Sequence, residues 1–368
     1  MIYFDHNATT PIDPRVVEAM LPYLTQLYGN PSSLYRLGRI ARSAIDTARE
    51  QVAALVDASA SQILFTSGGT EADAIAMFNA HGKRLMLSAI EHPAIFENVF
   101  RYPKRYREVI SLPVSADGVF SPEEIDRFHP QSDDFISLML ANNETGAIQD
   151  VRGLVNRLNG REVIVHTDAV QALGKIPLSF RQLGVDLMSL SSHKIYGPKG
   201  CGALVRRSGF ALESLQYGGE QEQGLRGGTE NVAAIVGFGK AAELARLEFN
   251  QRMDHLKRIK SRLEQQLKMI PGLVIFSESA ERLPNTVQFG IPGVNGEMLL
   301  MQMDQHGIAV SSGSACATGL EQISPVLAAM DVNVALAKSA VRVSLGKDNN
   351  EQEIDQFVSV LKTLLNNK

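Results

Sequence analysis

The chain has 368 residues, of which 44% are hydrophobic and 21% charged, a composition typical of soluble globular proteins. Its 36 basic and 40 acidic residues give a net charge of −4, which argues against a dedicated binder of nucleic acid or anionic membrane. No apolar run is long enough to span a bilayer, and the first residues lack the features of a secretion signal. Two cysteines cannot build a disulfide framework, so we expect a cytoplasmic protein with free thiols.

The first part of the chain predicts two helices followed by alternating strands and helices. Asp13 and Pro14 indicate the start of a helix that runs to Gly29, and a second helix is expected over residues 34–56. Short apolar runs then alternate with helical segments as far as about residue 245. The runs with strand character are QILF (62–65), RLMLS (84–88), FISLMLA (135–141), EVIVHT (162–167), VDLMSLS (185–191) and CGALVRR (201–207). This alternation predicts an α/β fold with a largely parallel sheet and helices on both faces.

The pattern changes near residue 250, where apolar residues at spacings of three and four predict one long amphipathic helix from Met253 to Ile270. Strand candidates follow at 285–289, 308–312 and 341–345. Asn350 and Glu353 predict a capping pair for a last helix, whose buried stripe is Ile354, Phe357, Val358, Leu361 and Leu365. We therefore expect a large domain over 16–250 and a smaller α+β domain made of 1–15 with 251–368.

Two polar groups lie at ends of predicted strands, where open α/β sheets bind their ligands. Ser67-Gly68-Gly69-Thr70 joins a strand to a helix, and its backbone N–H groups can hold an anion, although such a turn is often only a turn. Asp168 and Gln171 follow the end of a later predicted strand, EVIVHT (162–167). A carboxylate there can pair with a protonated ring nitrogen, or it can simply cap the next helix.

Two further candidates are a lysine and a histidine. Lys194, the fourth residue of SSHKIYGPKG, ends an apolar strand and can form a Schiff base with an aldehyde cofactor. Lys199, in the turn that follows, is expected to be solvated. His92 follows another strand, and a single histidine at such a place is often structural. The four groups taken together are the protein parts that pyridoxal phosphate (PLP) requires.

Eight motifs in this order resemble the cysteine desulfurase family, in particular the group linked to iron–sulfur cluster assembly and tRNA thiolation. They are DHNATTPIDPRV, SGGTEAD, EHPAI, NNETGAIQD, HTDAVQALGK, SSHKIYGPKG, RGGTEN and SSGSAC, and they cover nearly the whole chain. The resemblance implies a fold-type I PLP-dependent enzyme, a homodimer, L-cysteine as the substrate, and no metal.

The resemblance also implies a role for each matching residue. Lys194 would hold the cofactor and move the Cα proton. His92 would stack on the pyridine ring and, as a second catalytic residue, assist proton transfer. Asp168 would pair with the ring nitrogen. Asn143 and Gln171 would contact the phenolic side, and Asn143 with Arg342 would bind the substrate. The phosphate would be bound by Gly69, Thr70, Ser191 and His193, and by Thr229 across the dimer interface.

Cys316 would be the sulfur acceptor, which forms a persulfide while alanine is released. The small residues around it, from Ser311 to Gly319, predict a mobile loop. Without the cofactor motifs, a buried structural thiol would be an equal alternative for Cys316. Cys201 is expected to be a small core residue.

Other functions remain open at this point: an aminotransferase of the same fold, a selenocysteine lyase, or a non-catalytic binding subunit. The expected acceptors are an iron–sulfur scaffold and a tRNA-thiolation enzyme, with no membrane and no direct nucleic-acid contact. The basic and aromatic segment RYPKRYR (101–107) is expected to be a solvated surface rather than an RNA site.

Overall fold

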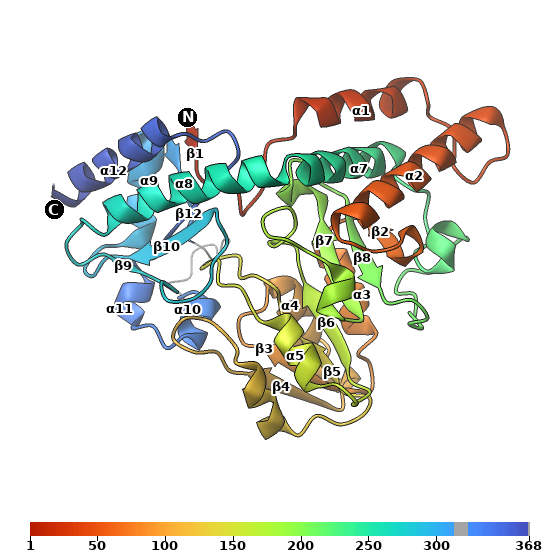
Figure 1. Cartoon of the computed structure of the whole chain (residues 1–368), viewed down its shortest axis with the longest axis horizontal. Helices are drawn as coiled ribbons and strands as arrows, with labels where there is room; N and C mark the ends of the chain where they lie inside the picture. The colour runs from red at the N-terminus through yellow and green to blue at the C-terminus, as the bar shows by residue number, and fades with distance from the viewer. Residues whose placement is uncertain (313–322, 367–368) are drawn as a thin grey trace.

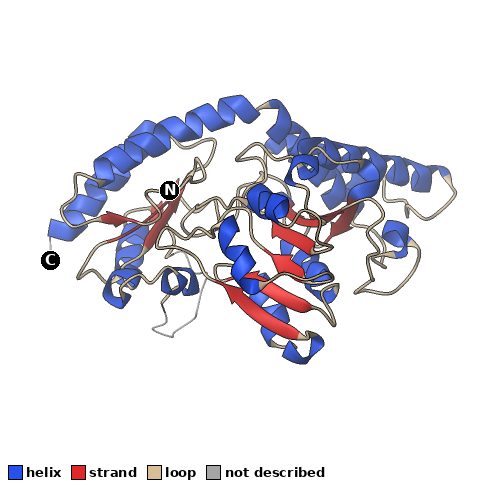
Figure 2. Cartoon of the chain, turned by 60° about the horizontal axis from the view of Figure 1, so that its bottom comes forward, coloured by secondary structure: helices blue, strands red, loops and turns tan. Residues whose placement is uncertain are grey.

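The computed structural model describes residues 1–312 and 323–366. Its larger part is a seven-stranded sheet with helices on both faces (Figures 1 and 2). The strand order is β4 (Glu108–Leu112), β3 (Arg84–Ser88), β5 (Phe135–Ser137), β6 (Ile164–Asp168), β7 (Leu187–Ser191), β8 (Gly202–Arg206) and β2 (Ile63–Thr66). The first five are parallel, whereas β8 runs antiparallel to both of its neighbours. The predicted α/β fold with a largely parallel sheet is confirmed.

Two apolar clusters bury the two faces of this sheet. One contains residues of α1 (Pro14–Thr25), α2 (Arg36–Leu55), α5 (Val151–Arg157), α6 (Phe180–Leu183) and α7 (Val232–Leu247). The other contains residues of α3 (Gly69–Phe78) and α4 (Pro93–Phe100). The near-continuous burial of the strands between these layers explains why they read as unbroken apolar runs rather than as alternating ones.

The smaller part combines two short sheets with five helices among the described residues. One sheet has the order β12 (Val341–Ser344), β10 (Thr286–Gly290) and β9 (Val274–Ile275), and the other pairs β1 (Ile2–Tyr3) with β11 (Ile308–Ala309). The helices are α8 (Phe249–Leu267), α9 (Gly296–Gln305), α10 (Pro325–Ala329), α11 (Val334–Ala337) and α12 (Glu351–Asn366).

The first residues of the chain belong to the core of this smaller part. Ile2 and Phe4 pack in one apolar cluster with residues 253–361, including the predicted stripe of α12. Figure 1 shows the N-terminus beside α8, α9 and α12, far from the seven-stranded sheet. This cluster supports the proposed domains of 16–250 and of 1–15 with 251–368. No helix in the described ranges is both long and apolar enough to cross a membrane.

Local sequence signals predicted several elements closely. Asp13 caps α1 by accepting the Arg15 N–H at 3.0 Å. Asn350 and Glu353 form the expected reciprocal pair, at 3.0 and 3.1 Å. In the segment 101–107 the Arg105 guanidinium stacks 4.1 Å from the Tyr102 ring centroid, so part of this basic surface is already engaged within the chain.

Candidate active site

A cavity of about 250 Å³ lies at the carboxyl edge of the large sheet, where β2, β3, β5, β6 and β7 all end. Because these strands run in the same direction, the motifs that follow them meet at this edge. The lining residues are Ala8, Gly69, Thr70, Asp73, His92, Met139, Asn143, Asp168, Val170, Gln171, Ser191, His193 and Lys194. Nine of the residues predicted from the sequence are thus brought together.

Lys194 places its amine inside this cavity. Its side chain leaves a short 3₁₀ turn, Ser192–Lys194, directly after β7. The Nζ atom donates to the carbonyl oxygens of Asn7 and, at 2.9 Å, of Ala8. Burial, followed by the positive charge of Arg342, lowers the pKa of Lys194 to about 8. A lysine of this kind supplies a neutral, nucleophilic amine near neutral pH more readily than an exposed one.

Asp168 and His92 supply two further polar groups of the cavity. Asp168 ends β6, and its Oδ1 accepts the Val170 N–H at 2.8 Å. Burial raises the pKa of Asp168, and His92 and Lys194 act in the other direction, so a cation placed beside the carboxylate would stabilise its charged form. Burial lowers the pKa of His92, whose Nδ1 accepts the Ala94 N–H at 3.1 Å. The neutral ring therefore carries its proton on Nε2.

One end of the cavity is built for an anion. Gly69 and Thr70 begin α3, whose N-terminus offers backbone N–H groups and a partial positive charge. A Cβ at Gly69 would lie 2.8 Å from Val170 Cγ2, so glycine permits a close approach here. The Ser191 hydroxyl is buried and has no hydrogen-bond partner among the described residues. His193 Nδ1 lies 3.1 Å from Thr9 Oγ1.

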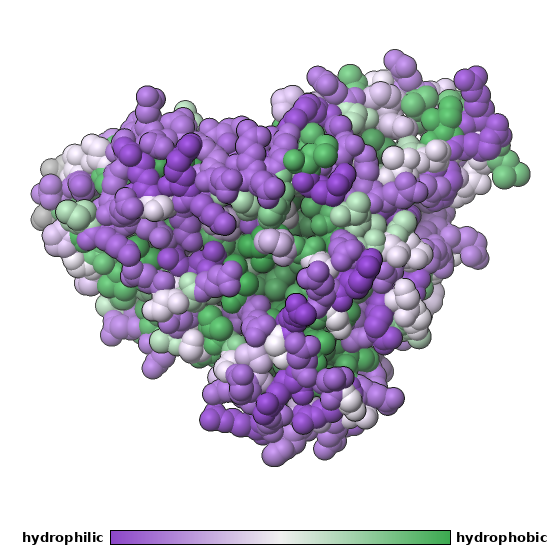
Figure 3. All heavy atoms as spheres, viewed as in Figure 1, coloured by the Kyte–Doolittle hydropathy of each residue, from purple (hydrophilic) through white to green (hydrophobic). Residues whose placement is uncertain are grey.

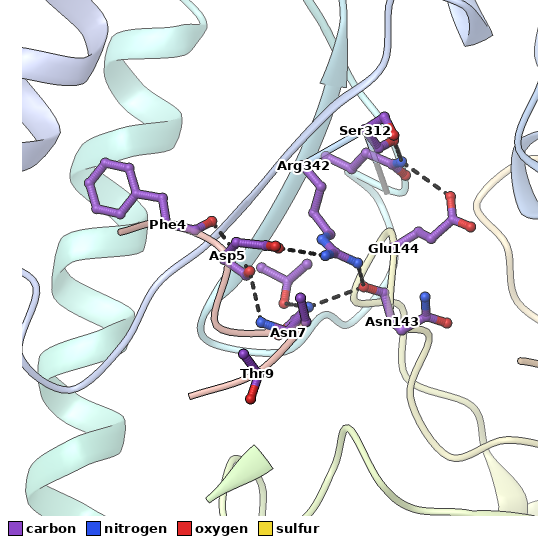
Figure 4. Close-up of polar contacts among 12 residues, drawn as sticks. Phe4, Asp5, Asn7, Thr9, Asn143, Glu144, Ser312 and Arg342 are labelled. Carbon is purple, nitrogen blue, oxygen red and sulfur yellow. Dashed lines mark hydrogen bonds and ion pairs between the residues drawn. The ribbon is translucent and has the colours of Figure 1, made fainter. Parts of the chain in front are cut away.

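Arg342 lies beside the cavity rather than among its lining residues. It extends from β12, donates through Nη2 to Asp5 Oδ1 at 2.6 Å and donates through Nη1 to the Asn143 carbonyl at 2.9 Å (Figure 4). Asn143 itself lines the cavity. The predicted substrate-binding arginine thus comes from the smaller part of the chain and reaches the site of the larger one. Asp5 fixes the direction of its guanidinium.

Thr229 and Cys316 complete the set of predicted site residues. Thr229 is exposed and is not among the described residues that line the cavity, and its predicted role at the site of a second copy stays a prediction. Cys316 lies outside the described residues. Its predicted role and the predicted mobility of its loop stay predictions.

Sequence reasoning missed three buried residues of this site. Asn7 is 1% exposed, and its carbonyl oxygen accepts hydrogen bonds from Lys194 and Gln171. Lys175 donates to Asn7 Oδ1 at 3.0 Å and to Gln171 Oε1 at 2.9 Å. Asp73 lines the cavity from α3. The spacing in the sequence could have identified Asp73 and Lys175, because each lies three or four residues beyond a predicted site residue in the same motif. Asn7 could not be found in this way, because it acts through its backbone carbonyl, which every residue has.

Comparison with known proteins places this site in a family. Residues 2–357 match the family model described as aminotransferase class-V. The chain belongs to this family. It is 38% identical to "Cysteine desulfurase IscS" of Dictyoglomus turgidum, over 99% of the chain and 94% of that protein. It is 40% identical to "Cysteine desulfurase" of Trichormus azollae, over 99% and 93%.

Solved structures extend the comparison to three dimensions. A "NifS-like protein" superposes with a TM-score of 0.92 at 36% identity, with 100% of both chains covered. A second NifS-like protein, from Rickettsia africae, gives 0.91 at 35% identity, with 100% of this chain and 99% of that one covered. "SspA in complex with cysteine" gives 0.82 at 29% identity, with 94% and 99% covered. The fold is that of the fold-type I PLP-dependent enzymes.

The cavity has the polar groups that PLP needs, as expected for a class-V enzyme. The unpartnered Ser191 hydroxyl and the start of α3 suit a phosphate, and the buried Asp168 carboxylate suits a protonated ring nitrogen. Gln171 and Asn143 also line the cavity, and Lys194 supplies an amine for the aldehyde. The described residues therefore fit this cofactor.

Proposed function

We propose that this protein is a PLP-dependent cysteine desulfurase, which converts L-cysteine to L-alanine and keeps the sulfur as a persulfide on Cys316. The observation that carries the proposal is the convergence of a buried amine, a buried carboxylate and a neutral imidazole, those of Lys194, Asp168 and His92, on one cavity. Two relatives at 38% and 40% identity that bear the name cysteine desulfurase support the choice of reaction.

Bound PLP supplies an aldehyde that condenses with amines and a ring that withdraws electrons from the bonds of the attached amino acid. Asp168 keeps the ring nitrogen protonated, because a buried carboxylate favours a neighbouring cation. Arg342 orients the substrate carboxylate through a bidentate contact, in place of the contacts it makes to Asp5 and Asn143. Lys194 then removes the Cα proton of the substrate through Nζ.

Sulfur transfer is carried out by a thiolate of the chain itself. The thiolate of Cys316 attacks the substrate sulfur, so that a new S–S bond forms while the carbon–sulfur bond of the substrate breaks. The substrate carbon gains a proton and leaves as alanine, and no external oxidant or reductant is required. L-Cysteine and a protein thiol thus give alanine and a protein persulfide.

Cys201 is unsuited to this role, which leaves Cys316 as the acceptor. It is 2% exposed, lies directly before β8 and belongs to the apolar core around the large sheet, as predicted. Burial, with Glu222 as the second cause, raises the pKa of Cys201 to about 12. A thiol of this kind is almost entirely protonated at neutral pH and is a poor nucleophile.

Product analysis tests the proposed reaction directly. Purified protein given PLP and L-cysteine is expected to release one alanine per sulfur retained, and a small thiol is expected to free that sulfur as sulfide. An aminotransferase would instead form the keto acid of cysteine and would need a second keto acid to accept the amino group. Keto acid without alanine would contradict the proposal. Turnover of selenocysteine with none of cysteine would identify a selenocysteine lyase.

A homodimer is part of this proposal. The exposed aliphatic and aromatic residues of the chain include five near the connection of α1 and α2: Leu21, Leu24, Tyr28, Leu34 and Tyr35. Figure 3 shows apolar side chains at the outer end of these two helices. Exposed apolar groups gathered in one place favour contact with another protein surface, here a second copy of this chain.

Mixing two inactive variants tests whether Thr229 serves the second copy. In a mixed dimer of Thr229→Ala and Lys194→Ala chains, one site carries both lesions and the other carries neither. Random mixing is expected to restore about one quarter of the wild-type activity, since half of the dimers are mixed and each has one intact site of two. Absence of recovery after demonstrated subunit exchange, or a monomer at working concentration, would contradict the proposal.

The sulfur is proposed to pass from Cys316 to acceptor proteins in the cytoplasm. Several relatives are named cysteine desulfurase IscS, which supports an acceptor of the iron–sulfur scaffold type. A tRNA-thiolation enzyme is the second proposed acceptor. Incubation of the persulfide-loaded protein with each purified acceptor shows which of them takes the sulfur.

A further inference from the structure

The segment that leads to Thr229 is a closed loop, residues 216–228. Gly227 N–H donates to the Gln216 carbonyl, and the Gln216 side-chain amide donates to the Gly227 carbonyl, both at 2.9 Å. The two ends also touch through their backbones, since a Cβ at Gly227 would lie 2.6 Å from Gly218 Cα. These contacts stabilise the conformation of the loop. Its position relative to the rest of the protein depends on two ion pairs that link it to other elements.

The first tie is a buried ion pair between Glu222 and Arg49 of α2. Both carboxylate oxygens accept from the guanidinium, at 2.6 and 2.7 Å, and Oε2 also accepts the Phe65 N–H of β2 at 2.9 Å. Glu222 and the next residue, Gln223, have φ of 47° and 61°, the left-handed region that costs energy outside glycine. Such a conformation persists only when surrounding contacts hold it.

The second tie joins the loop to the anion-binding end of the cavity. Arg226 Nε donates to Glu71 Oε1 at 2.8 Å, and its Nη2 donates to Oε2 at 3.3 Å. Glu71 Oε2 also accepts the Ser67 N–H at 2.6 Å. The two side chains are only 21% and 16% exposed, so solvent screens this pair much less than a surface ion pair.

Glu71 thus contacts two functional parts of the chain at once. It follows Gly69 and Thr70 in the first turn of α3, and through Ser67 it fixes the turn that leads into that helix. Through Arg226 it fixes a point three residues before Thr229. On the other side of Thr229, Glu230 pairs with Arg42 at 2.6 Å, so the exposed threonine is bracketed by two ion pairs.

We propose that Glu71 and Arg226 are positioning residues for cofactor binding. Their ion pair fixes the turn at residues 67–70, which is proposed to bind the cofactor phosphate in the same chain. It also holds Thr229 in the position from which it would contact the phosphate in the site of a second copy. The second half of this inference rests on the proposed dimer; the first half requires only that the cavity binds PLP. Neither side chain contacts the cofactor itself. They act through the phosphate turn and Thr229, which bind PLP, so their loss is expected to lower the affinity for PLP.

Cofactor titration tests the inference without reference to turnover. Apo protein is titrated with PLP, and binding is followed by visible absorbance, for wild type, Arg226→Lys, Arg226→Met and Glu71→Gln. Loss of a charge-assisted pair is expected to weaken PLP binding by about tenfold or more in Arg226→Met and Glu71→Gln. The affinity of Arg226→Lys for PLP is expected to lie between that of these two variants and that of wild type. Lysine keeps the positive charge but cannot donate to both carboxylate oxygens as the planar guanidinium does.

A matched control separates positioning from a general loss of stability. Arg84 and Asp134 form another mostly buried, bidentate pair, at the first residue of β3 and hence at the opposite edge of the sheet. Arg84→Lys is expected to lower the unfolding temperature to an extent similar to Arg226→Lys, yet to leave the affinity for PLP unchanged. Wild-type affinity in folded Arg226→Met and Glu71→Gln would overturn the inference. Failure of the wild-type protein to bind PLP would instead overturn the proposed function.

Mixed dimers test the part that concerns the second copy. One chain carries Lys194→Ala with Arg226→Met, and the other is wild type, so the wild-type site is the one that links PLP covalently. That site takes its Thr229 from the altered chain and is expected to bind PLP several-fold more weakly than a mixed dimer with Lys194→Ala alone. Equal affinity in the two mixed dimers would overturn action across the interface.

Discussion

Lys194→Ala is expected to remove the visible absorbance of covalently bound PLP and to reduce alanine formation by about 10²- to 10⁴-fold, the range typical for loss of an acid–base group. The physical reason is the position of the amine, which lies in the cavity with Asp168 and His92 and has a pKa lowered to about 8. The fold should be retained, since the hydrogen bonds of Nζ to the described residues go to two backbone carbonyls.

Lys199→Ala is the matched control. Lys199 lies five residues further along the chain in the same motif but is exposed, as predicted. Its replacement should change neither the spectrum nor the rate. Wild-type absorbance and turnover in Lys194→Ala, or their loss in Lys199→Ala, would show that the wrong lysine has been assigned.

Cys316→Ser has the second large expected effect, and it should differ in kind from the first. The variant should still bind PLP with normal visible absorbance, because none of the described residues lining the cavity is altered. It should make no persulfide, and its alanine formation should fall to background, since a serine hydroxyl is not ionised at neutral pH and cannot take the sulfur.

Cys201→Ala serves as the control for the second thiol. Because Cys201 lies in the core of the large domain, its replacement is expected to cost some stability while leaving the rate per folded molecule unchanged. A Cys316→Ser variant that turns over cysteine at the wild-type rate would contradict the proposed mechanism.

The residues that sequence reasoning placed in the cavity share one property: each closely follows or ends a strand. The carboxyl ends of parallel strands meet at one edge, so strand prediction alone brings Gly69, His92, Asp168 and Lys194 together. Local capping signals were equally reliable, as the Asn350–Glu353 pair shows.

Contacts between distant parts of the chain could not be predicted in this way. The pairs Asp5–Arg342 and Glu71–Arg226 join residues far apart in the sequence, and no local pattern shows that these residues pair with one another. The strand expected over 135–141 is shorter than predicted: β5 ends at Ser137, although Leu138 and Leu140 still donate to backbone carbonyls of β6. The length of this strand was overestimated because residues 138–141 are also apolar and buried, although they lie beyond the end of β5.

The central claim is that the sulfur of L-cysteine is transferred to Cys316. It is tested most directly by mass spectrometry of the holoenzyme after brief treatment with cysteine, with thiol-blocking reagent added before digestion. The account predicts one added sulfur on the peptide that contains Cys316 and none on the peptide that contains Cys201. Sulfur found on the Cys201 peptide, or on neither peptide while alanine accumulates, would contradict it.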